Sequence, residues 1–136
     1  MNNLGKESEV SELTKPIIEK FGNYLFEKDF AVLTMLYDSL GSSSYIASYK
    51  EKDMTKRKQI LLRGAKEIFE NPVALYGKNK WLDKIKASST GYLGMVITLY
   101  NRAEYNVILQ TELCERYLKL EPRNEGINKL LLSLRK

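Results

Sequence analysis

The chain has 136 residues, of which 43% are hydrophobic and 29% are charged, and its net charge is +5. These values are typical of one globular domain with a hydrophobic core, and they exclude a wholly disordered chain. The absence of histidine excludes the usual general base of serine and cysteine hydrolases, and also the commonest zinc ligand.

The first predicted elements form a helical hairpin. Residues 1–13 are polar, and we expect them to be a flexible segment that holds at most one loose turn. Thr14 is a candidate N-cap, and apolar residues then recur every three or four positions, so a helix is predicted to begin there. Asp29 can cap a second helix, which Gly41 and the three serines after it would end. We therefore predict a first hairpin over 14–41, joined by a very short turn.

The middle of the chain, residues 48–87, carries the excess of positive charge. Residues 50–86 contain nine lysines and two arginines against five acidic residues, a net charge of +6. Asp53 can cap a helix that Asn71 and Pro72 would end, and a turn and a short helix follow.

The basic residues of this segment allow two interpretations. Lysines and arginines can neutralise phosphates, and a ring such as Tyr76 or Trp81 can stack on a base, which would make the segment a nucleic-acid or other polyanion site. The interspersed acids, and the apolar side on which Trp81 falls, instead favour a solvated helix face. The candidate polyanion-binding residues are Lys56, Arg57, Lys58, Arg63, Lys66, Lys78 and Lys80.

The last third, residues 88–136, contains three more predicted helices. Ser and Thr at 88–90 supply a helix start, a turn at 101–104 leads into the second helix, and residues 121–124 break it. The third helix is amphipathic, with Ile127, Leu130, Leu131 and Leu134 on one side. The sequence thus predicts an all-α fold of about six to seven helices, with antiparallel hairpins packed as a short bundle or small array.

One stretch of this region resembles a tetratricopeptide repeat. It runs from about Thr90 to Asn124, with 127–134 in the place of a capping helix. Its spacing from the first helix to the turn is about two residues longer than the family pattern, and bulky Ile108 stands at a usually small position. The motifs that carry the resemblance are Tyr92-Leu93-Gly94, Leu99-Tyr100, Ala103-Glu104-Tyr105 and Leu120-Glu121-Pro122-Arg123-Asn124.

The resemblance implies a protein-interaction module that binds a partner peptide or helix in a groove. It makes Tyr92, Met95, Asn101 and Arg102 candidate partner contacts. The first two also suit a helix core, and the last two also suit a turn. Because a solenoid needs about three repeats to bury its faces, self-association or docking onto a larger partner is a further expectation. Nucleic-acid binding by the basic segment is the alternative.

An enzyme is the less favoured hypothesis, because no spacing brings two of the acidic residues together and the glycines lack a phosphate-binding pattern. We predict no catalytic residue, metal site or cofactor. The single cysteine, Cys114, suits a small buried hydrophobe and allows no internal disulfide. No segment has the composition of a signal peptide or a membrane span, so we expect a cytoplasmic protein.

Overall fold

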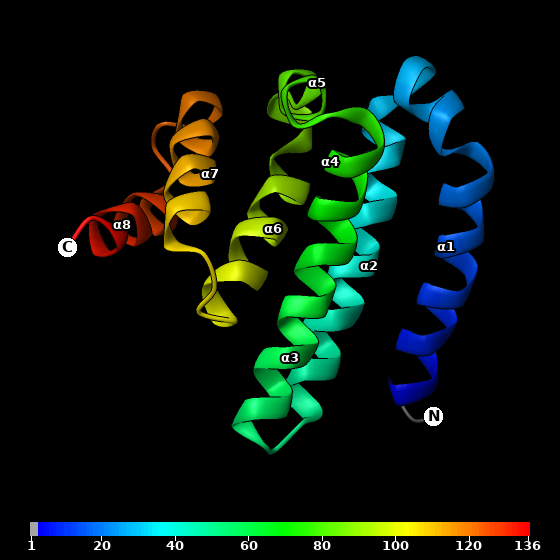
Figure 1. The fold of residues 1–136 in the computed structure, drawn as a ribbon, viewed down its shortest axis with the longest axis horizontal. Helices are drawn as coiled ribbons and strands as arrows, with labels where there is room; N and C mark the ends of the chain where they lie inside the picture. The colour runs from blue at the N-terminus through cyan, green and yellow to red at the C-terminus, as the bar shows by residue number, and fades with distance from the viewer. Residues whose placement is uncertain (1–2) are drawn as a thin grey trace.

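The computed structural model describes residues 3–136, with side chains described from Ser11 on. These residues form eight α-helices, a π-helical turn and a 3₁₀ turn, with no β-strand among them (Figure 1), which confirms the predicted all-α class. In chain order the elements are α1 (Asn3–Lys28), α2 (Phe30–Lys50), α3 (Met54–Ala65), η1 (Lys66–Glu70, the π turn), α4 (Asn71–Tyr76), α5 (Lys78–Lys84), η2 (Ala87–Ser89), α6 (Thr90–Arg102), α7 (Val107–Leu120) and α8 (Glu125–Leu134).

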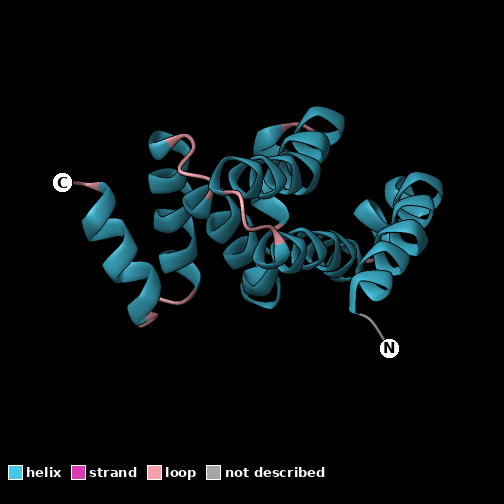
Figure 2. Ribbon diagram, turned by 90° about the horizontal axis from the view of Figure 1, so that it is seen from below, coloured by secondary structure: helices cyan, strands magenta, loops and turns pink. Residues whose placement is uncertain are grey.

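The long helices stand in a row with α1 at one end and α8 at the other (Figures 1 and 2). α1 packs along α2, α2 packs against α3 and α6, and α7 packs between α6 and α8. One hydrophobic core runs along this row, and Trp81, Tyr100 and Leu33 are among its largest fully buried side chains. The molecule is therefore a small bundle of helical hairpins.

α1 begins at Asn3, so the predicted start at Thr14 is wrong. Thr14 is 6% exposed in the interior of the helix. The residues before it include two leucines, one lysine and three glutamates, which favour helix and carry α1 toward the N-terminus. The expected flexibility of this segment stays a prediction, and Met1 and Asn2 lie outside the described residues.

α2 continues past its predicted end at Gly41 and runs to Lys50. Its small residues lie where other helices cross it closely. A Cβ atom at Gly41 would lie 2.6 Å from Cγ of Met95, and one at Gly64 of α3 would lie 2.5 Å from Cβ of Ser44. The Gly-Ser run is thus a helix-packing surface and not a helix end, because close packing outweighs the low helix propensity of glycine.

The helix end predicted at Asn71 and Pro72 is also wrong. The π turn η1 carries the chain past them: the N–H of Asn71 bonds to the carbonyl of Lys66, five residues back, and α4 follows directly. The helical segment ends at Gly77, whose φ of 90° suits a residue without a side chain.

Pro72 has a second effect on this segment. Proline has no N–H to give to the carbonyl of Ile68, four residues before it. The hydroxyl of Tyr92 on α6 donates to that carbonyl at 2.7 Å, and Nε1 of Trp81 donates to the Tyr92 oxygen at 2.9 Å. A buried chain of hydrogen bonds therefore joins α5, α6 and η1.

Helix caps agree better with the sequence. Oδ1 of Asp29 accepts from the N–H of Val32 at 3.3 Å, and Oδ1 of Asp53 accepts from the N–H of Thr55 at 2.8 Å. These two predicted N-caps are confirmed, whereas Thr14 lies inside α1 and Ser89 forms no side-chain cap hydrogen bond. The turn after α6 falls at 103–106, two positions later than expected.

The 103–106 turn lies where the spacing is longer than in the tetratricopeptide pattern. Two of its residues have a left-handed backbone, Glu104 (φ 55°) and Asn106 (φ 60°). Beyond it, Ile108 is 84% exposed on the outer side of α7. The Ile108 side chain therefore does not have to fit between α6 and α7.

α1 is apolar on its outer side as well as on its packed side. Leu13, Ile17, Phe21 and Tyr24 follow one another at helical spacing and are all exposed. The exposed side chains of α8, at the other end of the row, are mostly polar. The expectation of self-association stays a prediction, for which the outer side of α1 offers a surface.

Candidate functional site

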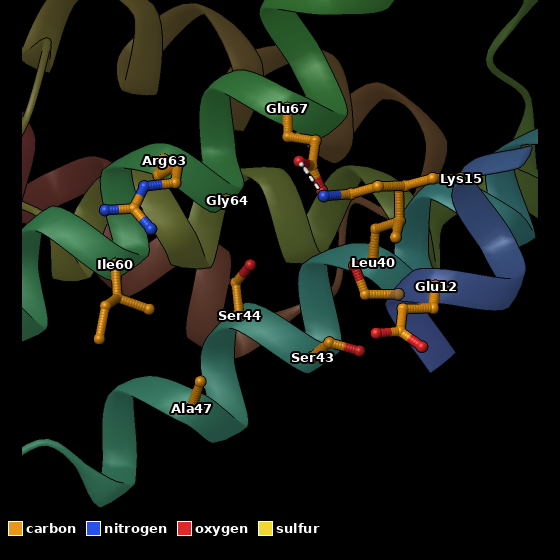
Figure 3. Close-up of a pocket in the computed structure, with 11 residues that line it drawn as sticks. Glu12, Lys15, Leu40, Ser43, Ser44, Ala47, Ile60, Arg63, Gly64 and Glu67 are labelled. Carbon is orange, nitrogen blue, oxygen red and sulfur yellow. Dashed lines mark ion pairs between the residues drawn. The ribbon is translucent and has the colours of Figure 1, made fainter. Parts of the chain in front are cut away.

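A groove runs over α2, between α1 on one side and α3, η1 and α4 on the other (Figure 3). It has two parts, with volumes of about 520 and 230 Å³. Both parts are lined by Lys15, Leu40 and Glu67, so they meet at these residues. Three helical segments that are separate in the sequence therefore build one elongated site.

The floor of the groove is made by one side of α2. Leu40, Ser43, Ser44 and Ala47 have the spacing i, i+3, i+4 and i+7, so they share a helix face. Three of these side chains are small, and Gly64 on the α3 wall has none. A floor of this kind lets the backbone of a bound segment come close to α2.

An ion pair crosses the groove at its middle (Figure 3). Nζ of Lys15 on α1 lies 3.1 Å from Oε2 of Glu67 on η1. The two side chains are 48% and 28% exposed, and a pair in such contact with water contributes little to stability. The crossing contact is therefore one that a bound molecule can displace at small cost.

The next gap along the row is crossed by more ion pairs. α6 is packed between the α3 side and α7. Ion pairs at 2.7, 2.8 and 4.0 Å join the α3 and α5 side to the α7 side there. Across the groove over α2, the described residues form only the Lys15–Glu67 pair. The bridging pairs of the second gap are Lys58–Glu104, Lys78–Glu112 and Asp83–Arg116.

The partner contacts predicted from the repeat resemblance lie elsewhere. Tyr92 is 2% exposed, and its hydroxyl is used within the core. Met95 is partly buried beside Gly41, and Asn101 is partly buried at the end of α6. Arg102 lies over the ring of Tyr45, 5.3 Å from its centroid. None of these four residues lines the groove over α2.

The predicted polyanion-binding residues are divided among several surfaces. Arg63 lines the groove, and Lys56 lies seven residues earlier on the same face of α3. Lys58 and Lys78 are paired with acids, and Lys80 is exposed on α5. Of the others, Arg57 donates from Nε and Nη2 to the carbonyl of Glu51, and Lys66 lies over the ring of Tyr105.

The rings proposed to stack on bases are also engaged inside the fold. Trp81 is fully buried, and Tyr76 stacks on Phe26 with ring centroids 4.2 Å apart. Of the two interpretations, the one in which Trp81 offers a stacking face is therefore wrong. The basic segment supplies helix faces and ion pairs on different sides of the molecule.

Other chemistry at the described residues is limited. Cys114 is buried as expected, and burial, with a smaller effect of Glu115, raises the pKa of its thiol to about 11. The described side chains contain no cluster of three metal-ligating groups. Within residues 3–136, no helix has both the length and the apolar composition needed to cross a bilayer.

Comparisons with protein-family models, curated proteins and solved structures return no match. The groove is therefore the feature from which we infer a function. Apart from Arg63, its residues were not predicted from the sequence, because the groove forms only when three helices are packed together. One signal was present: Glu12 and Glu19, like Lys56 and Arg63, are seven residues apart and share a helix face.

Proposed function

We propose that this protein is a protein-interaction module that binds an α-helical segment of a partner protein in the groove between α1 and α3. The observation that carries the proposal is the continuous groove over α2, with small residues on its floor and a weak ion pair across its middle. Helix-in-groove recognition uses a surface of this kind.

The shape of the floor favours a helix over an extended chain. Ser43, Ser44 and Ala47 form one short ridge of a helix surface, and a second helix packs on such ridges at an interaxial distance of about 8–10 Å. Leu40, Ile60 and Leu75 add apolar contact along the length of the groove. An amphipathic helix would bury its apolar side here and keep its polar side in water.

The charges around the groove favour a protein partner over a nucleic acid. Glu12 and Glu19 stand on the α1 wall, where they would repel a phosphate backbone that approached Arg63. Binding through the groove is therefore expected to depend only moderately on salt, in contrast to the steep dependence of phosphate-driven binding.

A photo-reactive residue on the groove floor tests the proposal. We would place p-benzoylphenylalanine at Ala47, and at Asn128 on the exposed side of α8 as a control, and irradiate cells that express each full chain. Position 47 should cross-link to a partner segment whose sequence is an amphipathic helix. The control position should not.

The cross-link must also depend on the groove. Ser43→Trp would fill the floor and abolish the cross-link from position 47, whereas Ser133→Trp on α8 would leave it intact. Equal products from positions 47 and 128, or a product that survives Ser43→Trp, would overturn the proposal.

A further inference from the structure

We infer that the groove selects a helix with one basic edge and one acidic edge, because the two helices that flank it carry unpaired charges of opposite sign, seven residues apart on each helix. This inference rests on the proposed function and specifies the chemistry of the partner.

The α1 wall is acidic. Glu12 and Glu19 both line the groove, Glu12 in the larger part and Glu19 in the smaller. Seven residues separate them, so they lie on one face of α1, about two turns apart. Neither carboxylate forms an ion pair with a described residue. Both are therefore available to a cation on a bound helix.

The α3 wall is basic. Arg63 lines the groove from α3 (Figure 3). Lys56 is exposed seven residues earlier on the same face of α3, two turns beyond Arg63 and outside the residues that line the groove. No ion pair to either side chain is formed by the described part of the chain. They would meet acidic residues on the other edge of a bound helix.

The ion pair at the centre of the groove does not change this balance. Lys15 belongs to the acidic wall and Glu67 to the basic wall, and at 3.1 Å each neutralises the other. The uncompensated charges are then Glu12 and Glu19 on one side and Lys56 and Arg63 on the other. A bound helix that displaces the pair would add Lys15 and Glu67 to its own contacts.

The seven-residue interval on both walls matches the heptad of a helix that lies nearly along α1 and α3. In helix pairs and bundles, residues seven apart on one edge face the same neighbour, and charges on such edges determine the choice of partner. A partner helix with basic residues at i and i+7 on one edge, and acidic residues at i and i+7 on the other, would therefore satisfy both walls.

Three synthetic helices test the inference. They share one apolar stripe and a fluorescent label and differ in their edges: one has a lysine and a glutamate edge, one has two lysine edges and one has two glutamate edges. Binding to the full chain is measured by fluorescence anisotropy at low salt. We expect the mixed helix to bind about tenfold more tightly than the others, as the sum of several weak pairs.

Charge reversal on one wall is the second test of the charge rule. The double variant K56E/R63E makes both walls acidic, so the preference should pass to the helix with two lysine edges. The matched variant K80E/K129E has the same change of net charge away from the groove and should keep the preference for the mixed helix.

The outcomes separate this inference from the proposed function. Equal binding of the three helices, or an unchanged preference in K56E/R63E, would overturn the charge rule while leaving a helix-binding groove. If no helix binds and position 47 yields no groove-dependent cross-link, the proposed function itself fails. The comparison of the three helices therefore tests the charge rule, and the cross-link tests the helix-binding groove.

Discussion

The hydroxyl of Tyr92 donates a hydrogen bond of 2.7 Å to the carbonyl oxygen of Ile68, the acceptor that Pro72 cannot serve. The same hydroxyl accepts from Nε1 of Trp81 at 2.9 Å. One buried oxygen thus satisfies two polar groups that the fold has removed from water. Because a buried polar group without a partner is costly, this small network should be important for stability.

Replacement of Tyr92 by phenylalanine would leave the carbonyl of Ile68 and the indole N–H of Trp81 unpaired in the core. We expect the free energy of unfolding to fall by about 2–4 kcal/mol, measured by urea denaturation. Tyr24→Phe, at an exposed ring, is the matched control and should change it by less than about 0.5 kcal/mol. Equal effects of the two substitutions would contradict this account.

Gly64→Ala tests the close crossing of α2 and α3. The new Cβ would lie 2.5 Å from Cβ of Ser44, so the helices must separate, at a cost of about 1–3 kcal/mol. Gly91→Ala, where the nearest atom is 3.7 Å away, should instead stabilise α6 by up to about 1 kcal/mol. Thermal unfolding of both variants decides between packing and propensity: a stabilised Gly64→Ala would refute the packing argument.

Lys84 ties α5 to the end of α1. Its ammonium donates to the carbonyl of Phe26 at 2.7 Å and lies 4.5 Å from the centroid of the Phe26 ring. Lys84→Met keeps the apolar stem but removes both contacts, and we expect a loss of about 1–2 kcal/mol in chemical denaturation. Lys86→Met, at a neighbouring exposed lysine, provides the control and should have no measurable effect.

The ion pair across the groove should contribute little to the fold. Glu67→Gln removes its negative charge while keeping the shape of the side chain, and we expect a change in unfolding free energy below about 1 kcal/mol. The affinity for the mixed-edge helix should remain within a few fold, since the charges that select the helix are Glu12 and Glu19 on α1 and Lys56 and Arg63 on α3. A loss of several kcal/mol in denaturation would show that the pair holds α1 in place.

Stability should fall at alkaline pH. Burial raises the pKa of Cys114 to about 11 and raises the pKa values of Tyr92 and Tyr100 above their ordinary value of 10.0. The unfolded chain therefore loses these protons first, so the stabilisation is complete below about pH 9 and is lost as pH rises through the folded-state values. Urea midpoints measured from pH 8 to pH 11 should decrease steadily above pH 9, and a flat profile would contradict the assignment.

The sequence predicted what depends on local chemistry. Asp29 and Asp53 were identified as N-caps because a carboxylate beside free backbone N–H groups acts within three residues. The burial of Cys114 and Trp81 followed from the helical spacing of apolar residues around them. Such features need no knowledge of the rest of the fold.

The errors came from contacts between distant segments. Gly41 and the serines after it have low helix propensity. α2 nevertheless needs a small residue at position 41, where Met95 and Ile68 lie close, and at Ser44, where Gly64 lies close. Pro72 was predicted to end a helix because proline lacks an N–H. The helix continues because Tyr92, twenty residues later in the sequence, donates to the carbonyl of Ile68 instead. The groove could not be predicted for the same reason, since Glu12 and Arg63 line one site only after α1, α2 and α3 have packed.

The π turn lets the segment between Met54 and Tyr76 lose one residue and keep its orientation. A π turn holds one residue more than an α-helical turn, so deletion of a residue from η1 would restore a regular helix and leave the residues after it on the faces they now occupy. Tyr76 would then keep its stack on Phe26, which holds the end of α1. The same deletion within α4 would instead rotate Tyr76 by about 100° away from Phe26 and should release one wall of the groove while leaving its floor intact.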